Sequence, residues 1–94
     1  MVEVRQTEEF SAWLHGLSDP HAVARIVARI RRMEQGNPGD SVGEGVLEMR
    51  ISYGPGYRVY YVQRGAQVVI LLCGGDKRTP RRDIKRAQTL AEAM

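Results

Sequence analysis

Apolar residues near the start of the chain recur every three or four positions, which is the period of one face of a helix. The residues that follow this period are Phe10, Trp13, Leu14 and Leu17. Thr7 stands just before them and offers the side-chain oxygen of a good N-cap. Two glutamates follow it in the first turn, where the helix dipole favours acids. The pattern therefore predicts a first helix that begins after Thr7 and buries one apolar face.

A second apolar stripe begins after Asp19-Pro20, in which the aspartate suits an N-cap and the proline suits the first helical position. Gly36 is the expected C-cap glycine of this second helix. The stripe consists of Val23, Ile26, Val27, Ile30 and Met33, and the opposite face carries Arg25, Arg29 and Arg32. Because only a short turn separates the two helices, we expect a helical hairpin with one apolar side.

The apolar period changes to two after residues 37–45, a stretch rich in Gly, Pro and Asp that predicts a loop. The predicted strands are residues 46–51, 57–63 and 68–73. The third of these is apolar throughout, as expected of a strand that is covered on both sides. Short connections between the three strands predict an antiparallel meander, and residues 2–5 are the candidate for an additional edge strand.

The last predicted element is a helix over residues 80–93 with Thr79 as its N-cap, and Gly74-Gly75 is expected to end the strand before it. The fold class expected from these elements is α+β. Its sheet is antiparallel with three to four strands, is covered by the N-terminal helical hairpin and is followed by a C-terminal basic helix. We expect a single domain over residues 1–94, because a chain of this length has room for only one core.

Charge is distributed unevenly between the two halves of the chain. The net charge is +3 overall, but it is −3 over residues 1–49 and +6 over residues 50–94. Concentration of positive charge in one half favours a polyanionic partner more strongly than the modest total does. RNA and DNA are the partners that this distribution suggests.

Six cations lie close together in residues 74–87, and we expect them to contact nucleic-acid phosphates. Arg81 and Arg82 fall in the first turn of the predicted helix, where the dipole disfavours cations but free backbone N–H groups attract an anion. The alternative is a solvated basic face without a ligand. The cations of the segment are Lys77, Arg78, Arg81, Arg82, Lys85 and Arg86.

Arg50 and Arg58 form a second candidate site, because a short hairpin would place their strands side by side. Both residues alternate away from the apolar face of the predicted sheet, with Tyr60 beside them for stacking on a base. Two neighbouring guanidinium groups repel each other, so the arrangement is favourable chiefly with an anion between them. In the alternative interpretation, Arg50 pairs with Glu48 or Glu44 and Arg58 is an ordinary surface arginine.

Several other kinds of protein are not supported by the sequence. The single cysteine, Cys73, excludes an internal disulfide framework and cannot make a metal site alone, so we expect neither a metal nor a cofactor. The amino terminus lacks the apolar run of a signal peptide. The longest apolar run, residues 68–73, is far shorter than the roughly 20 residues that span a bilayer. A cytoplasmic protein without a membrane partner is the expected class.

Two segments carry a resemblance to a known family. The strand and turn sequence YGPGYRVYY and the later LLCGGDKRT, preceded by LEMRI, resemble the RelE/ParE superfamily of bacterial type II toxins. The likeness is closest to the HigB-like branch, the addiction-module killer proteins, and it covers nearly the whole chain. It implies a small antiparallel sheet with packed helices and a toxin that a co-expressed antitoxin neutralises, with a helix-turn-helix antitoxin as the expected kind.

The resemblance also implies an activity and the residues for it. RelE-like members cleave messenger RNA on the ribosome without a metal, by attack of the messenger's own 2′-OH on the adjacent phosphate. The family's catalytic cations match Arg58, Lys77 or Arg78, and Arg50. The tyrosine that RelE-like enzymes often carry in the last helix is replaced here by Ile84. This leaves proton transfer to Lys77 or Lys85, or leaves catalysis largely to electrostatic stabilisation. This departure keeps two alternatives open: a ParE-like inhibitor of DNA gyrase, and a nucleic-acid-binding module without catalysis.

Overall fold

The protein is described here by a computed structural model that covers residues 2–34 and 39–94. Three helices and five strands make up the described part of the chain. They are β1 (Glu3–Gln6), α1 (Glu8–His15), α2 (Pro20–Glu34), β2 (Asp40–Gly43), β3 (Val46–Ile51), β4 (Tyr57–Arg64), β5 (Val68–Asp76) and α3 (Pro80–Glu92). The α+β class is therefore confirmed.

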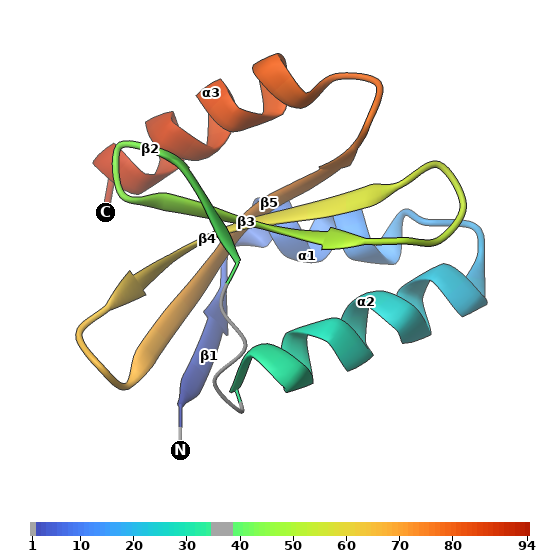
Figure 1. The fold of residues 1–94 in the computed structure, drawn as a ribbon, viewed down its shortest axis with the longest axis horizontal. Helices are drawn as coiled ribbons and strands as arrows, with labels where there is room; N and C mark the ends of the chain where they lie inside the picture. The colour runs from blue at the N-terminus through green and yellow to red at the C-terminus, as the bar shows by residue number, and fades with distance from the viewer. Residues whose placement is uncertain (1, 35–38) are drawn as a thin grey trace.

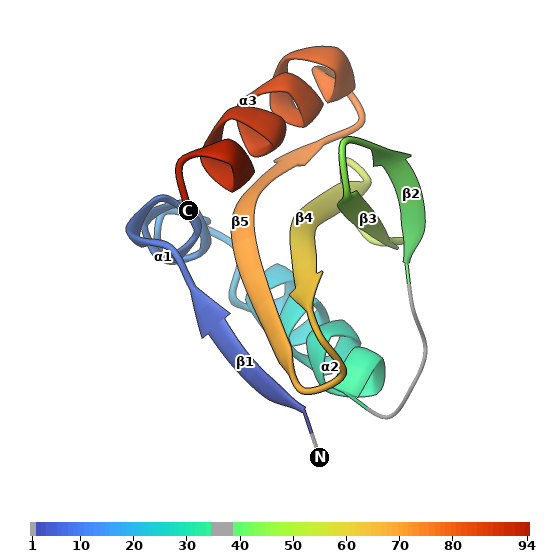
Figure 2. The ribbon, with the colours of Figure 1, turned by 90° about the vertical axis from the view of Figure 1, so that its left-hand side faces the viewer.

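The strands form one mixed sheet in the order β1-β5-β4-β3-β2. The predicted antiparallel meander is confirmed for β3, β4 and β5, and β1 is an edge strand as expected. The prediction of a wholly antiparallel sheet is wrong, because β1 runs parallel to β5 (Figure 2). Between β1 and β5 the chain passes through α1, α2 and three further strands. It then enters β5 in the same direction as β1, so the two strands pair in parallel.

The strand β2 corrects the prediction of a loop over residues 37–45. Asp40 and Ser41 pair with Glu48 and Leu47, so β2 extends the sheet to a fifth strand. The chain reverses between β2 and β3 through three consecutive residues with positive φ, Gly43, Glu44 and Gly45. The glycines of this turn are typical of a loop, so the composition of the whole stretch predicts a loop and gives no sign of the short strand before the turn.

The helices α1 and α2 cover one face of the sheet (Figure 1). The main core lies there and joins both helices to three strands. Its buried residues are Phe10, Ile26, Ile30, Met33, Met49, Ile51, Val59, Tyr61, Val69 and Leu71. Within the described residues, no helix is long and apolar enough to cross a membrane.

The helix α3 covers the other face of the sheet, which the sequence analysis had left open (Figure 1). A second core forms beneath it from residues of β3, β4, β5 and α3, and Ala87 provides the close contact of the helix. The buried members are Val46, Tyr60, Val62, Leu72, Cys73 and Ala87. The strands β4 and β5 are consequently buried on both sides, as the unbroken apolar run of β5 indicated.

The helix starts agree with the predicted caps, with one exception. Thr7 accepts a hydrogen bond from the Phe10 amide at 3.0 Å, and Asp19 accepts one from the His21 amide at 2.9 Å. Thr79 precedes α3 as expected, but its hydroxyl bonds to the Asp83 carboxylate instead of a backbone amide. The expected C-cap Gly36 lies outside the described residues.

The prediction that Gly74-Gly75 ends the third strand is wrong, because β5 continues to Asp76. These glycines allow close packing on both sides of the strand. A Cβ atom on Gly74 would collide with the Trp13 ring, and one on Gly75 would collide with the Asp83 carboxylate. Side chains of α1 and α3 therefore approach the β5 backbone closely at both glycines.

Candidate active site

The candidate site is built on β3 and β4, at the end of the sheet next to the start of α3. Arg50 on β3 and Arg58 on β4 stand directly opposite each other in register. Directly opposed residues on one face of an antiparallel pair have Cβ atoms about 4.5–5.5 Å apart. The predicted juxtaposition of the two arginines is therefore present, and it requires an anion to offset their repulsion.

Glu48 supplies that anion in the free protein. Its side chain is only 2% exposed, and it accepts a hydrogen bond from Arg50 Nε at 2.8 Å. Arg58 Nη1 lies 3.6 Å from the other carboxylate oxygen. The hydrogen bond that Arg50 donates to Glu48 raises the pKa of the Arg50 guanidinium above its ordinary value. The alternative interpretation is confirmed in its pairing of Arg50 with Glu48. It is wrong for Arg58, which is only 17% exposed and lies against the same carboxylate instead of being an ordinary surface arginine.

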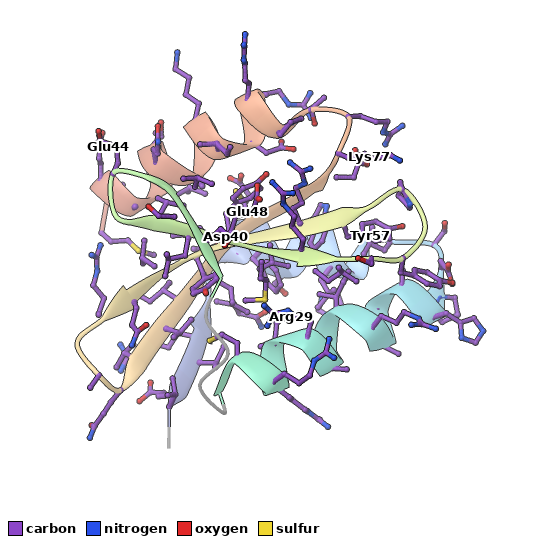
Figure 3. All side chains as sticks on the ribbon, viewed as in Figure 1. Arg29, Asp40, Glu44, Glu48, Tyr57 and Lys77 are labelled. Atoms are coloured by element: carbon purple, nitrogen blue, oxygen red, sulfur yellow. The ribbon has the colours of Figure 1, made fainter. Side chains whose placement is uncertain are left out.

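Glu48 is the residue of this site that the sequence analysis did not select. The period of two in β3 places it on the same face as Arg50, so the signal was present. An exposed glutamate beside an arginine is usually an ordinary surface pair, however, and its nearly complete burial is what distinguishes Glu48. Figure 3 shows Glu48 on the side of the sheet that faces α3.

The expectation that Tyr60 stacks on a nucleic-acid base is wrong. Tyr60 is 0% exposed because α3 covers its strand, so no base can reach its ring. Burial raises the pKa of the Tyr60 hydroxyl, the nearby Glu48 carboxylate raises it further, and Arg58 opposes both. The hydroxyl makes no hydrogen bond within the described residues. Tyr60 therefore lies buried beside the Glu48–Arg58 pair.

Lys77 lies at the rim of the site, where the chain passes from β5 to α3 (Figure 3). It is exposed, and its aliphatic stem packs near Gly56 in the turn between β3 and β4. Gly56 has a positive φ of 78°, so the turn that supports Lys77 needs a glycine there. Lys77 is thus two residues beyond Gly75, which pairs with Arg58 in the sheet.

The remaining predicted RNA-binding cations fall into two groups. Three of them already have acidic or hydroxyl partners: Arg78 with Asp76, Arg82 with Thr79 and Asp83, and Arg86 with Glu9 on α1. Arg81 and Lys85 are exposed on α3 and make no ion pair within the described chain. The basic segment is therefore partly structural, and its Arg86–Glu9 pair links α3 to α1.

The arrangement can accept a singly charged oxyanion such as a phosphodiester. Arg50, Arg58 and Glu48 together leave one net positive charge, which matches one phosphodiester. Arg50 is 63% exposed, so its guanidinium can leave Glu48 for an incoming anion. In the described part of the chain, no three His, Cys, Asp or Glu residues are placed to hold a metal ion together.

Comparison with known proteins identifies the family. Residues 12–92 match the family described as phage-derived protein Gp49-like (DUF891). The chain belongs to this family. A Haemophilus influenzae protein described as uncharacterized is 46% identical over 95 residues, which cover 99% of this chain and 96% of that protein. The matched region includes Glu48, Arg50, Arg58 and Lys77, so the whole candidate site lies within the family domain.

A solved structure shares the fold. The solution structure of the conserved hypothetical protein HP0894 from Helicobacter pylori matches with a TM-score of 0.53 and 17% sequence identity. The match covers 82% of this chain and 96% of HP0894. Family and fold are consistent with the toxin-like class that the sequence motifs suggested, while the HigB-like branch stays a prediction.

Proposed function

We propose that this Gp49-like protein is the toxin of a type II toxin–antitoxin system and acts as a ribosome-dependent, metal-independent messenger-RNA endonuclease. The observation that carries the proposal is the buried Glu48 carboxylate between the opposed guanidinium groups of Arg50 and Arg58. Cleavage of RNA by its own 2′-OH needs a proton acceptor and cations around one phosphate, and this cluster offers both.

The reaction assigns a role to each member of the cluster. The 2′-oxygen forms a bond to the adjacent phosphorus, and its proton passes to the Glu48 carboxylate. Arg58 and Arg50 stabilise the added negative charge of the phosphorane. The bond from phosphorus to the 5′-oxygen then breaks, and the Lys77 ammonium protonates that leaving oxygen. The products are a 2′,3′-cyclic phosphate and a 5′-hydroxyl.

Arg50 controls access to Glu48 in this mechanism. In the free protein its Nε holds Glu48 at 2.8 Å, although most of the Arg50 side chain is exposed to solvent. A phosphodiester would compete for the guanidinium and draw it away from the carboxylate. Glu48 then becomes available to the 2′-OH at the moment when the phosphate is bound, while Arg58, only 17% exposed, stays in place.

An acid-rich antitoxin is the partner that this surface requires when the toxin is inactive. The site and the outward cations Arg81 and Lys85 give this side of the molecule a positive field. A segment with carboxylates could neutralise that field and block Arg50 from reaching RNA. We expect such a segment to come from a co-expressed protein.

The test is pulse labelling after induced expression in bacteria, with amino-acid and thymidine incorporation followed separately. Amino-acid incorporation should fall first while thymidine incorporation continues. Arg58→Ala and Glu48→Gln should abolish this fall, because loss of a charge-stabilising cation or of the general base each costs about 100-fold or more in rate. Arg64→Ala is the matched control, since Arg64 is an exposed arginine at the far end of the same strand and should leave toxicity unchanged.

Each result has a defined meaning. A fully toxic Arg58→Ala protein would contradict the proposal. Early loss of thymidine incorporation would instead support an inhibitor of DNA gyrase. Far-ultraviolet circular dichroism of both variants establishes that they are folded, and Glu48→Gln removes the charge and basicity of the carboxylate while keeping the size of the side chain. RNA binding without cleavage in wild type would indicate a binding module.

A further inference from the structure

Tyr60 carries a buried polar group that takes no part in the bond changes of the proposed reaction. The residue is 0% exposed, and its hydroxyl makes no hydrogen bond within the described residues. Its ring packs in the second core together with Val62 and Leu72. A phenylalanine would fill the same space without a buried donor, and a buried donor that lacks a partner lowers stability. The packing of this core therefore does not account for the hydroxyl.

The register of the sheet places Tyr60 beside the proposed catalytic groups. Tyr60 on β4 stands directly opposite Glu48 on β3. The opposed pair of Arg50 and Arg58 lies two residues along the same two strands. Burial raises the pKa of the Tyr60 hydroxyl, and the nearby Glu48 carboxylate raises this pKa further, so the hydroxyl keeps its proton at neutral pH. Tyr60 can therefore donate a hydrogen bond to a carboxylate, but it cannot act as a base.

Departure of Arg50 would leave Glu48 in need of a new hydrogen-bond donor. In the free protein, Arg50 Nε donates to one carboxylate oxygen at 2.8 Å, and Arg58 Nη1 lies 3.6 Å from the other. When a phosphodiester draws Arg50 away, the carboxylate loses that hydrogen bond although its side chain is only 2% exposed. A buried carboxylate with too few hydrogen bonds is strongly unfavourable. Because Arg50 then no longer fixes its orientation, the carboxylate is free to turn toward the donor on the opposite strand.

We propose that Tyr60 is a positioning residue, whose hydroxyl donates a hydrogen bond to Glu48 when Arg50 moves to the substrate phosphate. The catalytic consequence of this bond rests on the proposed endonuclease function. One hydrogen bond then satisfies both the Tyr60 donor and the buried carboxylate. It also holds one carboxylate oxygen in place, which leaves the other oxygen for the 2′-OH. Because Tyr60 is wholly buried, it acts through Glu48 and touches no atom of the substrate.

The first measurement is a double-mutant cycle of stability, which needs no substrate. Arg50→Ala leaves Glu48 without its Arg50 partner, as the phosphate would. In the wild-type background, Tyr60→Phe should leave the urea midpoint unchanged or raise it slightly, because it removes a donor that has no partner there. In the Arg50→Ala background, the same substitution should lower the midpoint by about 1 M, because it removes a hydrogen bond to a charged group. Equal effects in the two backgrounds would overturn the inference.

The second measurement separates binding from reaction. Ribosomes that hold a defined messenger are mixed with excess protein, and the rate at which cut ends appear is followed against protein concentration. Tyr60→Phe should lower the maximal rate about tenfold and leave the concentration for half the maximal rate unchanged, because the lost hydrogen bond orients the base and touches no RNA.

Tyr61→Phe is the matched control on the same strand. Tyr61 is also buried, at 1% exposure, but it belongs to the other core and its hydroxyl accepts a hydrogen bond from the Gly39 amide at 2.6 Å. Loss of that bond should lower the melting temperature by about 4–8 °C and leave the cleavage rate unchanged. The two substitutions remove the same atom, so opposite effects on stability and rate distinguish positioning from packing.

The two measurements also separate this inference from the endonuclease function. A Tyr60→Phe protein that cleaves at the full maximal rate would overturn the inference while wild type remains an endonuclease. An equal loss of rate in Tyr61→Phe would overturn it as well, because a general effect of packing would then explain both variants. If wild type cleaves no RNA but the urea cycle shows the expected coupling, the endonuclease function fails and the hydrogen bond between Tyr60 and Glu48 stands.

Discussion

At the residue scale, Gly74 shows how a sequence motif can have a packing explanation in place of a ligand. The strand β5 passes between the Trp13 ring of α1 on one face and the Asp83 carboxylate of α3 on the other. Both residues approach the backbone more closely than any side chain on the strand would allow. The two glycines therefore let helices from opposite layers settle onto the same stretch of β5.

We expect Gly74→Ala to destabilise the protein by about 1–3 kcal/mol, because the new methyl group overlaps the benzo ring of Trp13 and forces the core to rearrange. Urea unfolding followed by circular dichroism measures the change. In a Trp13→Phe background the same substitution should cost clearly less, since the smaller ring vacates the contested space. Equal costs in the two backgrounds would show that the Trp13 contact is not the cause.

The residue scale also shows what the sequence could predict of the site. The period of two in β3 and β4 was sufficient to bring Arg50 and Arg58 to the same place on one face. The same pattern misplaced Tyr60 on an open surface, because a strand's alternation separates two faces but does not reveal what covers each. Burial of Tyr60 and Glu48 depends on α3, whose own apolar side is weak and centred on the small Ala87.

At the scale of elements, the turn after β3 is tied to the start of α2. Tyr53 donates a hydrogen bond to Asp19 Oδ2 at 2.8 Å, while Asp19 Oδ1 accepts from the His21 amide. Arg25 lies over the Tyr53 ring, 4.8 Å from its centre. These contacts join the turn after β3 to the first half of α2.

Asp19→Ala should lower the melting temperature about twice as much as Tyr53→Phe, because it removes both the helix cap and the tether, whereas Tyr53→Phe removes only the tether. Thermal melts at pH 7 measure both. Asp19→Asn is the control that keeps an acceptor for the cap.

The Tyr53 hydrogen bond lowers the pKa of Asp19, so the charged carboxylate favours the folded state. The advantage of wild type over Asp19→Asn is therefore present above the ordinary pKa of 3.8 and is lost as pH falls through the lowered pKa. An advantage unchanged in acid would contradict this account.

The elements differ in how well the sequence revealed them. The sequence predicts α2 and β5 well, because the amphipathic pattern of α2 and the apolar run of β5 are stronger than the turn signals near them. The strand β2 has only four residues and is almost wholly exposed, so no apolar alternation marks it. The parallel pairing of β1 with β5 joins residues about 65 positions apart, such as Glu3 and Val68, and no local pattern encodes such a contact.

At the scale of the whole molecule, the two cores share the strands β4 and β5 and should not unfold separately. Tyr61 and Val69 belong to the core under α1 and α2, while Tyr60 and Leu72 belong to the core under α3. Loss of either layer would expose one face of these central strands to water. The chain also provides a single probe on each side, because it contains one tryptophan and one cysteine.

We therefore predict that both probes report the same urea midpoint. Trp13 fluorescence follows the core beneath α1, and the rate of Cys73 alkylation follows the core beneath α3. Burial raises the pKa of the Cys73 thiol to about 12, so the native protein presents almost no reactive thiolate near pH 8.

Ala87→Leu should shift both midpoints downward together, because overpacking under α3 costs about 1–3 kcal/mol and the shared strands pass that cost to the other core. Alkylation of Cys73 at a lower urea concentration than the fluorescence change would mean that α3 detaches on its own. In that case Glu48 and Tyr60 would be exposed before the fold is lost, and α3 would be a separable cover of the candidate active site.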